Sequence, residues 1–186
     1  MRSLIWSDEE MKRHTLAVLV ENKPGVLARI SGLFSRRGFN IESLAVGVTE
    51  NVDISRITIV VSGDDAVLEQ VKKQLNKLID VIHIAELAPN SSVSRELALI
   101  KVGVDATTRS MVMQIVDVFR ARIIDVSTDS LIVEVTGSKG KIASIQRLLS
   151  QFGIKEMVRT GKVALHRRSQ TAADTMPEEL QRPIEE

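Results

Sequence analysis

The sequence predicts an α+β protein made of two copies of the same β-α-β-β-α-β unit. Two observations predict this fold. Short segments of alternating apolar residues, typical of strands, are separated by segments in which apolar residues recur every three or four positions, as on one face of a helix. The same order of segments occurs before and after a polar hinge at residues 88–92, which contains Pro89. A chain of 186 residues is long enough for two small domains.

The first copy opens with a strand at residues 14–20, where Leu16, Val18 and Val20 alternate with their neighbours. Pro24 has a fixed φ that suits the start of a helix, and this helix is expected to end before Gly38. Three strands and a second helix complete the copy: the strands at residues 41–48, 54–61 and 81–87, and the helix with the apolar stripe Val67, Val71, Leu75 and Leu78.

The second copy repeats this order from Glu96 onward. Its predicted elements are the strands at residues 97–104, 123–127, 131–136 and 158–165 and the helices at residues 107–120 and 141–152. The order is that of the ferredoxin-like unit, in which two helices cover one face of a four-stranded antiparallel sheet. Both copies are therefore expected to fold as ferredoxin-like βαββαβ domains, with antiparallel sheets and helices on one face.

These patterns divide the chain into five parts. They are an N-terminal extension at residues 1–11, a first domain at 12–88, a linker at 89–95, a second domain at 96–168 and a disordered tail at 169–186. Ser7 and Glu10 fit a capping box, which predicts a short helix from Asp8 to Lys12. The tail is polar and contains Pro, a composition with too little apolar surface to fold by itself.

The composition argues against several functions. A net charge of +1 gives no field that would draw the chain to nucleic acid or to an anionic membrane, and 3% aromatic residues offer few platforms for stacking bases. The chain has no Cys, and its three His residues are far apart, so disulfides and a zinc site are not expected. No apolar run approaches the ~20 residues of a membrane span. The expectation is a cytoplasmic protein without nucleic-acid or membrane partners.

The link between the first strand and the first helix is the candidate functional site. The N–H groups near Gly25 lie at a helix N-terminus, which suits a carboxylate. Side-chain oxygens of Asn22 or Asn40, at what look like neighbouring strand ends, can accept hydrogen bonds from an ammonium group, and nearby apolar side chains can hold an aliphatic group. These features predict a site for a free amino acid. The candidate residues are Asn22, Lys23, Pro24, Gly25, Val26, Leu27, Asn40 and Ile41.

A purely structural interpretation of the same residues is also open. Asn22 can cap the helix, Gly25 can make the turn, and Asn40 can be a left-handed turn residue. The repeat bears on this choice. Aligning the first strands, Leu97 on His14, gives an offset of 97 − 14 = 83, and neither the Asn-Lys-Pro-Gly turn nor the Gly-Phe-Asn segment recurs at that offset. The motifs are thus not required by the fold, so function is expected in the first copy.

The chain contains no recognisable catalytic motif. It has no Ser-His-Asp arrangement and no dinucleotide-binding fingerprint. The segment at residues 136–141 superficially suggests a phosphate loop, but only two residues separate Gly137 from Gly140, and Ile142 follows Lys141 where a Ser or Thr is needed. An ordinary turn entering a helix is expected there, and no enzyme activity is expected of this chain alone.

The segment LAVLVENKPGVLARISGLFSRRGFNIESL at residues 16–44 closely resembles the ACT domain of the regulatory small subunits of acetohydroxyacid synthase, also called acetolactate synthase. The resemblance continues through residues 55–59, 68–78, 95–102 and 123–126. It covers about residues 12 to 167, and its two most specific blocks are NKPGVL and RRGFNIESL.

The resemblance implies a homodimeric, non-catalytic subunit in isoleucine, leucine and valine biosynthesis. Such a subunit activates a catalytic large subunit that condenses pyruvate with pyruvate or 2-ketobutyrate. Thiamine diphosphate, Mg²⁺ and FAD are expected in that partner, and no cofactor in this chain. The resemblance also implies feedback inhibition by a branched-chain amino acid, usually valine, bound between two ACT domains. Residues 22–27 of one protomer and Asn40-Ile41 of the other would form the effector site.

An alternative remains that the chain is a stand-alone amino-acid-sensing ACT module of another enzyme or of a transcription regulator. A transcription regulator requires a helix-turn-helix and a basic face, and the sequence pattern contains neither.

Overall fold

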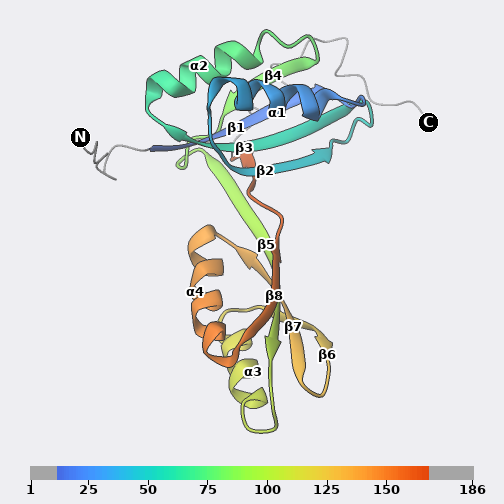
Figure 1. Ribbon diagram of the computed structural model, residues 1–186, viewed down its shortest axis with the longest axis vertical. Helices are drawn as coiled ribbons and strands as arrows, with labels where there is room; N and C mark the ends of the chain where they lie inside the picture. The colour runs from blue at the N-terminus through green and yellow to red at the C-terminus, as the bar shows by residue number, and fades with distance from the viewer. Residues whose placement is uncertain (1–11, 168–186) are drawn as a thin grey trace. The chain divides into compact units, whose positions relative to one another are not determined.

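The computed structural model describes residues 12–167, which form two β-α-β-β-α-β units (Figure 1). The elements of the first unit are β1 (Lys12–Glu21), α1 (Val26–Arg37), β2 (Ile41–Val48), β3 (Ile54–Gly63), α2 (Asp65–Leu75) and β4 (Val81–Glu86). The elements that follow are β5 (Ser92–Gly103), α3 (Arg109–Val118), β6 (Arg122–Val126), β7 (Ser130–Gly137), α4 (Lys139–Leu149), the 3₁₀ turn η1 (Ser150–Phe152), β8 (Ile154–Arg159) and β9 (Val163–His166). The predicted α+β fold of two ferredoxin-like units is confirmed.

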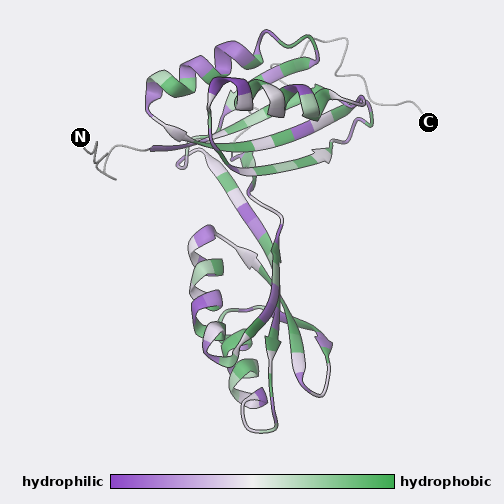
Figure 2. Ribbon diagram, in the orientation of Figure 1, coloured by the Kyte–Doolittle hydropathy of each residue, from purple (hydrophilic) through white to green (hydrophobic). Residues whose placement is uncertain are grey.

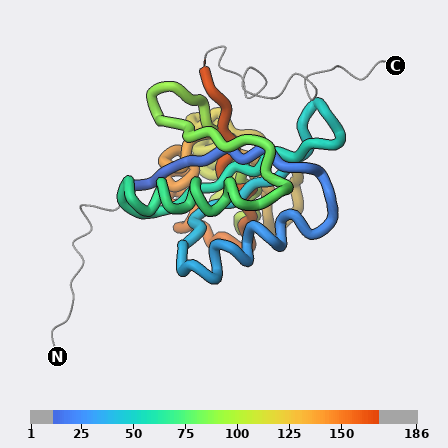
Figure 3. Tube along the Cα trace, turned by 90° about the horizontal axis from the view of Figure 1, so that it is seen from above, coloured from blue at the N-terminus to red at the C-terminus, as the bar shows by residue number. Residues whose placement is uncertain are grey.

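The first sheet has the strand order β2-β3-β1-β4, and every neighbouring pair is antiparallel. Helices α1 and α2 lie side by side on one face of it (Figures 1 and 3). Each helix has an apolar and a polar face, seen as green and purple segments in Figure 2. The core between helices and sheet consists of Leu16, Val18, Val20, Val26, Ile30, Leu33, Phe34, Ile57, Ile59, Val61, Leu68, Val71 and Leu75.

The second sheet repeats this arrangement with the strand order β6-β7-β5-β8. Its core consists of Ala98, Ile100, Val102, Val104, Val112, Val116, Leu131, Val133, Val135, Ile142, Ile145 and Leu149. The segment that superficially suggested a phosphate loop is an ordinary helix start. Ser138 caps α4 there, because its side chain accepts a hydrogen bond from Lys141 N at 3.3 Å.

The prediction of a single last strand at residues 158–165 is wrong. The segment forms parts of two strands: β8 takes the fourth place in the second sheet, and β9 pairs with β5 separately. Gly161, with φ of 81°, lies between them and allows the chain to change direction. β8 also begins earlier than predicted, because Ile154 and Met157 pack against the second core.

The chain divides at different residues from those predicted. The second unit comprises Ser94–Val163, and the described residues after it belong with the first unit. Ala164 is buried there against Ala17 and Leu87, which explains why the chain end groups with the first unit. Residues 92–95, expected in a linker, already form the start of β5, because β9 pairs with this strand.

The predicted helix from Asp8 and the predicted tail at residues 169–186 lie outside the described residues. Lys12, expected as the last residue of that helix, instead begins β1. Over residues 12–167, none of the helices has the length and apolar character needed to cross a membrane.

Candidate functional site

The turn between β1 and α1 leaves two N–H groups of the helix without a partner. Residues 22–25 are exposed, and Gly25 precedes α1 with φ of 85°, a left-handed conformation that glycine adopts without strain. The first helical hydrogen bond runs from Arg29 N to Gly25 O at 2.9 Å. Within residues 12–167, the N–H groups of Leu27 and Ala28 have no acceptor, so this helix end can bind an anion.

The side chains of this turn divide between core and surface. Val26 is buried in the core, whereas Leu27 is 43% exposed beside the free N–H groups. Lys23 Nζ lies 2.9 Å from Glu21 Oε2, and the hydrogen bond with Glu21 raises the pKa of Lys23. Leu27 is thus the apolar side chain of the turn that a ligand can reach, and the charge of Lys23 is already paired.

The side chain of Asn22 does not cap α1, so that structural interpretation is wrong. Its Nδ2 donates a hydrogen bond to Val52 O at 2.8 Å, and its Oδ1 accepts one from Ser55 Oγ at 3.1 Å. Asn22 N also donates to Asp53 O at 2.7 Å. The turn is therefore fastened to the β2–β3 connection. One lone pair of Oδ1 remains for a further donor, because a carbonyl oxygen accepts two hydrogen bonds.

Asn40 is not a left-handed turn residue either. α1 ends in a Schellman motif, in which Gly38 has φ of 70° and donates to Ser35 O, while Phe39 N donates to Phe34 O at 3.1 Å. The rings of Phe34 and Phe39 meet edge to face, with centroids 6.1 Å apart. Gly38 thus makes the turn, and Asn40 has no positive φ. Its side chain is exposed, with no hydrogen bond to any described residue.

Asn22 and Asn40 lie at opposite ends of the first sheet. The turn at Asn22 follows the end of β1 that pairs with Ile54, whereas Ile41, beside Asn40, pairs with Val61 near the far end of β3. α1 connects the two ends, and its 12 residues span about 18 Å. One chain therefore does not bring both asparagines to one ligand, although the sequence suggested neighbouring strand ends.

A second charged pair lies beside the turn, and no local pattern in the sequence indicates it. Arg29 Nε lies 2.7 Å from Asp80 Oδ2, and Arg29 Nη2 lies 2.8 Å from Asp80 Oδ1, so the guanidinium and the carboxylate form a bidentate pair. Asp80 is buried just before β4, and its carbonyl accepts a hydrogen bond from Glu21 N at 3.0 Å. Arg29 and Asp80 are 51 positions apart in the sequence, so no local pattern predicts that they pair.

The second unit places a carboxylate of its own, that of Asp105, just before the corresponding helix α3. Arg109 N donates to Asp105 O, as Arg29 N does to Gly25 O. Asp105 Oδ1 then accepts hydrogen bonds from Thr107 N and Thr108 N, both at 2.8 Å. The sequence offset of 83 placed Asp105 on Asn22, but the buried residues Ile30 of α1 and Val112 of α3 correspond at an offset of 112 − 30 = 82, which places Asp105 on Lys23. At the start of α1, no side chain of the described residues accepts such a hydrogen bond.

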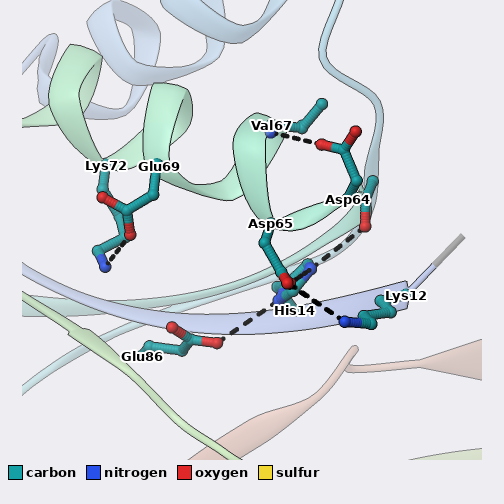
Figure 4. Close-up of polar contacts among 9 residues, drawn as sticks. Lys12, His14, Asp64, Asp65, Val67, Glu69, Lys72 and Glu86 are labelled. Atoms are coloured by element: carbon teal, nitrogen blue, oxygen red, sulfur yellow. Dashed lines mark hydrogen bonds and ion pairs between the residues drawn. The ribbon is translucent and has the colours of Figure 1, made fainter.

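Other polar groups of the first unit are structural. Asp64 caps α2 by accepting a hydrogen bond from Val67 N at 2.8 Å (Figure 4). Asp65 lies 3.2 Å from Lys12 Nζ and 3.9 Å from His14 Nε2. Among the residues in the described range, no group of three or more His, Asp or Glu side chains could hold a metal ion.

A pair of β-α-β-β-α-β units with a ligand-accessible helix end fits the class of ACT-type regulatory proteins, and two family models establish that class. The family model of the acetohydroxyacid synthase small subunit-like ACT domain matches residues 16–83, and that of the small subunit of acetolactate synthase matches residues 95–168. The chain belongs to the family of acetolactate synthase small subunits, which are regulatory and not catalytic.

Similar proteins agree with this assignment. An acetolactate synthase small subunit from Mycobacterium bovis is 62% identical over 156 residues, which cover 84% of this chain and 93% of that protein. A probable acetolactate synthase small subunit from Archaeoglobus fulgidus is 60% identical over 155 residues, covering 83% and 97%. The crystal structure of the small subunit from Thermotoga maritima has a TM-score of 0.80 at 43% identity, covering 84% of this chain and 98% of that one.

Proposed function

We propose that this chain activates the catalytic large subunit of acetolactate synthase and makes it sensitive to a branched-chain amino acid, with valine as the first candidate. The observation that carries the proposal is the open N-terminus of α1, where the N–H groups of Leu27 and Ala28 face a turn with no side chain at Gly25. A free carboxylate fits this helix end, and the exposed Leu27 suits an aliphatic side chain. In this proposal thiamine diphosphate, Mg²⁺ and FAD belong to the catalytic subunit, in the cytoplasm.

The effector site is proposed to form between two copies of the chain. Among the described strands β2 is at the edge of the sheet and pairs only with β3, and Val46 and Val48 on it are 47% and 65% exposed. Its last residue, Val48, pairs with Ser55, which is hydrogen-bonded to Asn22. If two β2 strands pair antiparallel about a two-fold axis, the start of one meets the end of the other. Asn40 of a second copy then approaches the Asn22 turn.

Regulation then follows from linkage between the two binding events. An effector that binds across the pair of ACT domains favours one arrangement of that interface, and inhibition results if the catalytic subunit favours another. Such couplings are typically about 1–3 kcal/mol, and they are reciprocal. The catalytic subunit is therefore expected to weaken effector binding by the same factor by which the effector weakens binding of the catalytic subunit.

Calorimetry and an enzyme assay test the two halves of this proposal. The purified chain is titrated with valine, leucine and isoleucine, and then the variants Asn22→Ala and Asn40→Ala are titrated in the same way. Acetolactate formation from pyruvate is measured with the catalytic subunit alone, with this chain added, and with both the chain and the amino acid. We expect weaker binding in both variants, activation by the chain, and inhibition by the effector. Unchanged affinity in both variants would contradict the site, and no effect on the catalytic subunit would contradict the function.

A further inference from the structure

We infer that Arg29 is a further contact for the carboxylate of the effector, held in position by Asp80. This inference rests on the proposed function, because it adds a charged group to the same site. The N–H groups of Leu27 and Ala28 provide neutral donors, and a carboxylate binds more strongly when a cation is also present. Arg29 is on the first turns of α1, beside those two residues.

The geometry of the guanidinium leaves one nitrogen for a ligand. Asp80 uses Nε and Nη2 of Arg29, at 2.7 and 2.8 Å. Nη1, the third nitrogen, has no acceptor among the described residues. It lies 3.7 Å from the position that a Cβ would occupy on Gly25. Both N–H groups of Nη1 are therefore free, as far as the described residues go, directly beside the glycine of the turn.

Asp80 makes this arrangement rigid. The side chain of Asp80 is 8% exposed, while that of Arg29 is 50% exposed, so the anchor is inside and the guanidinium reaches the surface. The carbonyl of Asp80 is also bonded to Glu21 N, at the end of β1. The guanidinium thus loses little further freedom when it binds a ligand, which reduces the entropic cost of binding.

The other cation of the turn does not offer the same contact. Lys23 is paired with Glu21, as described above. A lysine at position 29 also could not replace the arginine. An ammonium group can reach the carboxylate of Asp80, but it lacks the planar fork that holds Asp80 with two nitrogens and presents a third. Arg29→Lys therefore keeps the charge and the ion pair and removes Nη1.

The opposing interpretation is that Arg29 and Asp80 only fasten α1 to the start of β4. The two interpretations differ in how they treat a ligand without a carboxylate. A fastening role predicts that Arg29→Lys weakens every ligand of the turn equally, since the two-nitrogen contact with Asp80 is reduced to one. A carboxylate contact predicts that only ligands with a carboxylate lose affinity.

The test is calorimetry with valine and with valinamide, which has the same side chain and ammonium group but no carboxylate. The wild-type chain, Arg29→Lys and Arg37→Lys are compared; Arg37 is the last residue of α1 and serves as the matched control. We expect Arg29→Lys to weaken valine binding roughly tenfold, the effect of one charge-assisted hydrogen bond. Valinamide should bind Arg29→Lys and wild type within about twofold of each other. Arg37→Lys should bind both ligands as the wild type does.

An equal loss for both ligands in Arg29→Lys, or no loss for either, would overturn the inference and leave the proposed function standing. Failure of the wild-type chain to bind valine, leucine or isoleucine would instead overturn the proposed function itself. Asp80→Asn is the second variant in case Arg29→Lys does not fold. Asp80→Asn keeps Nη1 of Arg29 but weakens the ion pair that holds the guanidinium in position. This variant should therefore weaken valine binding by a smaller factor than Arg29→Lys and leave valinamide binding unchanged.

Discussion

The hydroxyl of Ser55 donates a hydrogen bond to the side-chain oxygen of Asn22 at 3.1 Å, and this bond joins the turn before α1 to strand β3. Ser55 is buried, and Asn22 completes the link by donating to Val52 O. The turn that carries the candidate site is therefore held by the β2–β3 connection and not by its own helix. The position of Asn22 for a ligand depends on residues about 30 positions further along the chain.

Ser55→Ala should lower the free energy of unfolding by about 1 kcal/mol, because it removes one buried donor and leaves the Asn22 oxygen to water. Urea unfolding measures this change. Ser31→Ala is the control, since the hydroxyl of Ser31 bonds only to Ala28 O of its own helix at an exposed position. The control should stay within about 0.5 kcal/mol of the wild type. Equal losses in the two variants would count against the anchoring role.

Gly25→Ala should lower the free energy of unfolding by about 1–2 kcal/mol, because an alanine at φ of 85° is strained in the left-handed region. The matched control is Gly140→Ala, at the start of α4, where φ is not positive. Alanine is preferred in a helix, so this control should be neutral or raise stability by up to about 1 kcal/mol. Chemical denaturation of both variants decides the matter, and a Gly25→Ala chain as stable as the wild type would refute the strain argument.

Mixing two binding-deficient variants should restore effector binding if the site is shared between copies. In a mixed dimer of Asn22→Ala and Asn40→Ala, one site carries both substitutions and the other carries none. Half of the dimers are mixed after equimolar exchange, so about a quarter of all sites should be intact. Calorimetry after refolding the two variants together measures this fraction. A mixture that binds no better than its two components would contradict the shared site.

Val46→Lys should shift the chain from dimer to monomer, because a charged side chain on the free edge strand β2 opposes pairing of two edges. Sedimentation velocity over a range of concentrations measures the change. Ile124→Lys is the matched control: it places the same charge on β6, the edge strand of the second sheet, where Ile124 is similarly exposed. A wild-type chain that is monomeric at all concentrations, or a control that dissociates equally, would contradict pairing through β2.

Asp105→Asn should flatten the acid dependence of stability. Hydrogen bonds from the Thr107 hydroxyl and from the Thr107 and Thr108 N–H groups hold the pKa of Asp105 well below its ordinary value of 3.8. The unfolded chain therefore binds a proton at a higher pH than the folded chain does. The stabilisation is present above the ordinary pKa and is lost as the pH falls below it towards the folded-state pKa. Unfolding midpoints between about pH 5 and pH 2 should fall less steeply in Asp105→Asn. Parallel curves for the two proteins would contradict this account.

The strands, the helices and the location of the turn were predictable from the sequence because each depends on local patterns. Leu16, Val18 and Val20 lie in the core as their alternation indicated, and Gly25 takes the conformation that a glycine in a turn allows. The division of the last strand was not predictable in this way. It depends on Gly161 and on the pairing of β9 with a strand far away in the sequence.

The contacts within the site were also hard to predict from the sequence, because they join distant segments. The partners of Asn22 are Val52 and Ser55, and the partner of Arg29 is Asp80, so each contact joins segments that only the folded sheet brings together. The place of Asp105 was also hidden, because the alignment of the first strands used an offset of 83. The buried residues of the two units correspond at an offset of 82, which places Asp105 on Lys23.

The carboxylate of Asp105 belongs to the same chain as the N–H groups that donate to it, so it is always present beside them. In the proposed function, the matching helix end of the first unit takes its carboxylate from the solution, and the occupancy of that end follows the amount of free amino acid in the cell. The carboxylate beside α3 is thus a fixed part of the chain, whereas in this proposal the carboxylate beside α1 comes and goes with the supply of free amino acid.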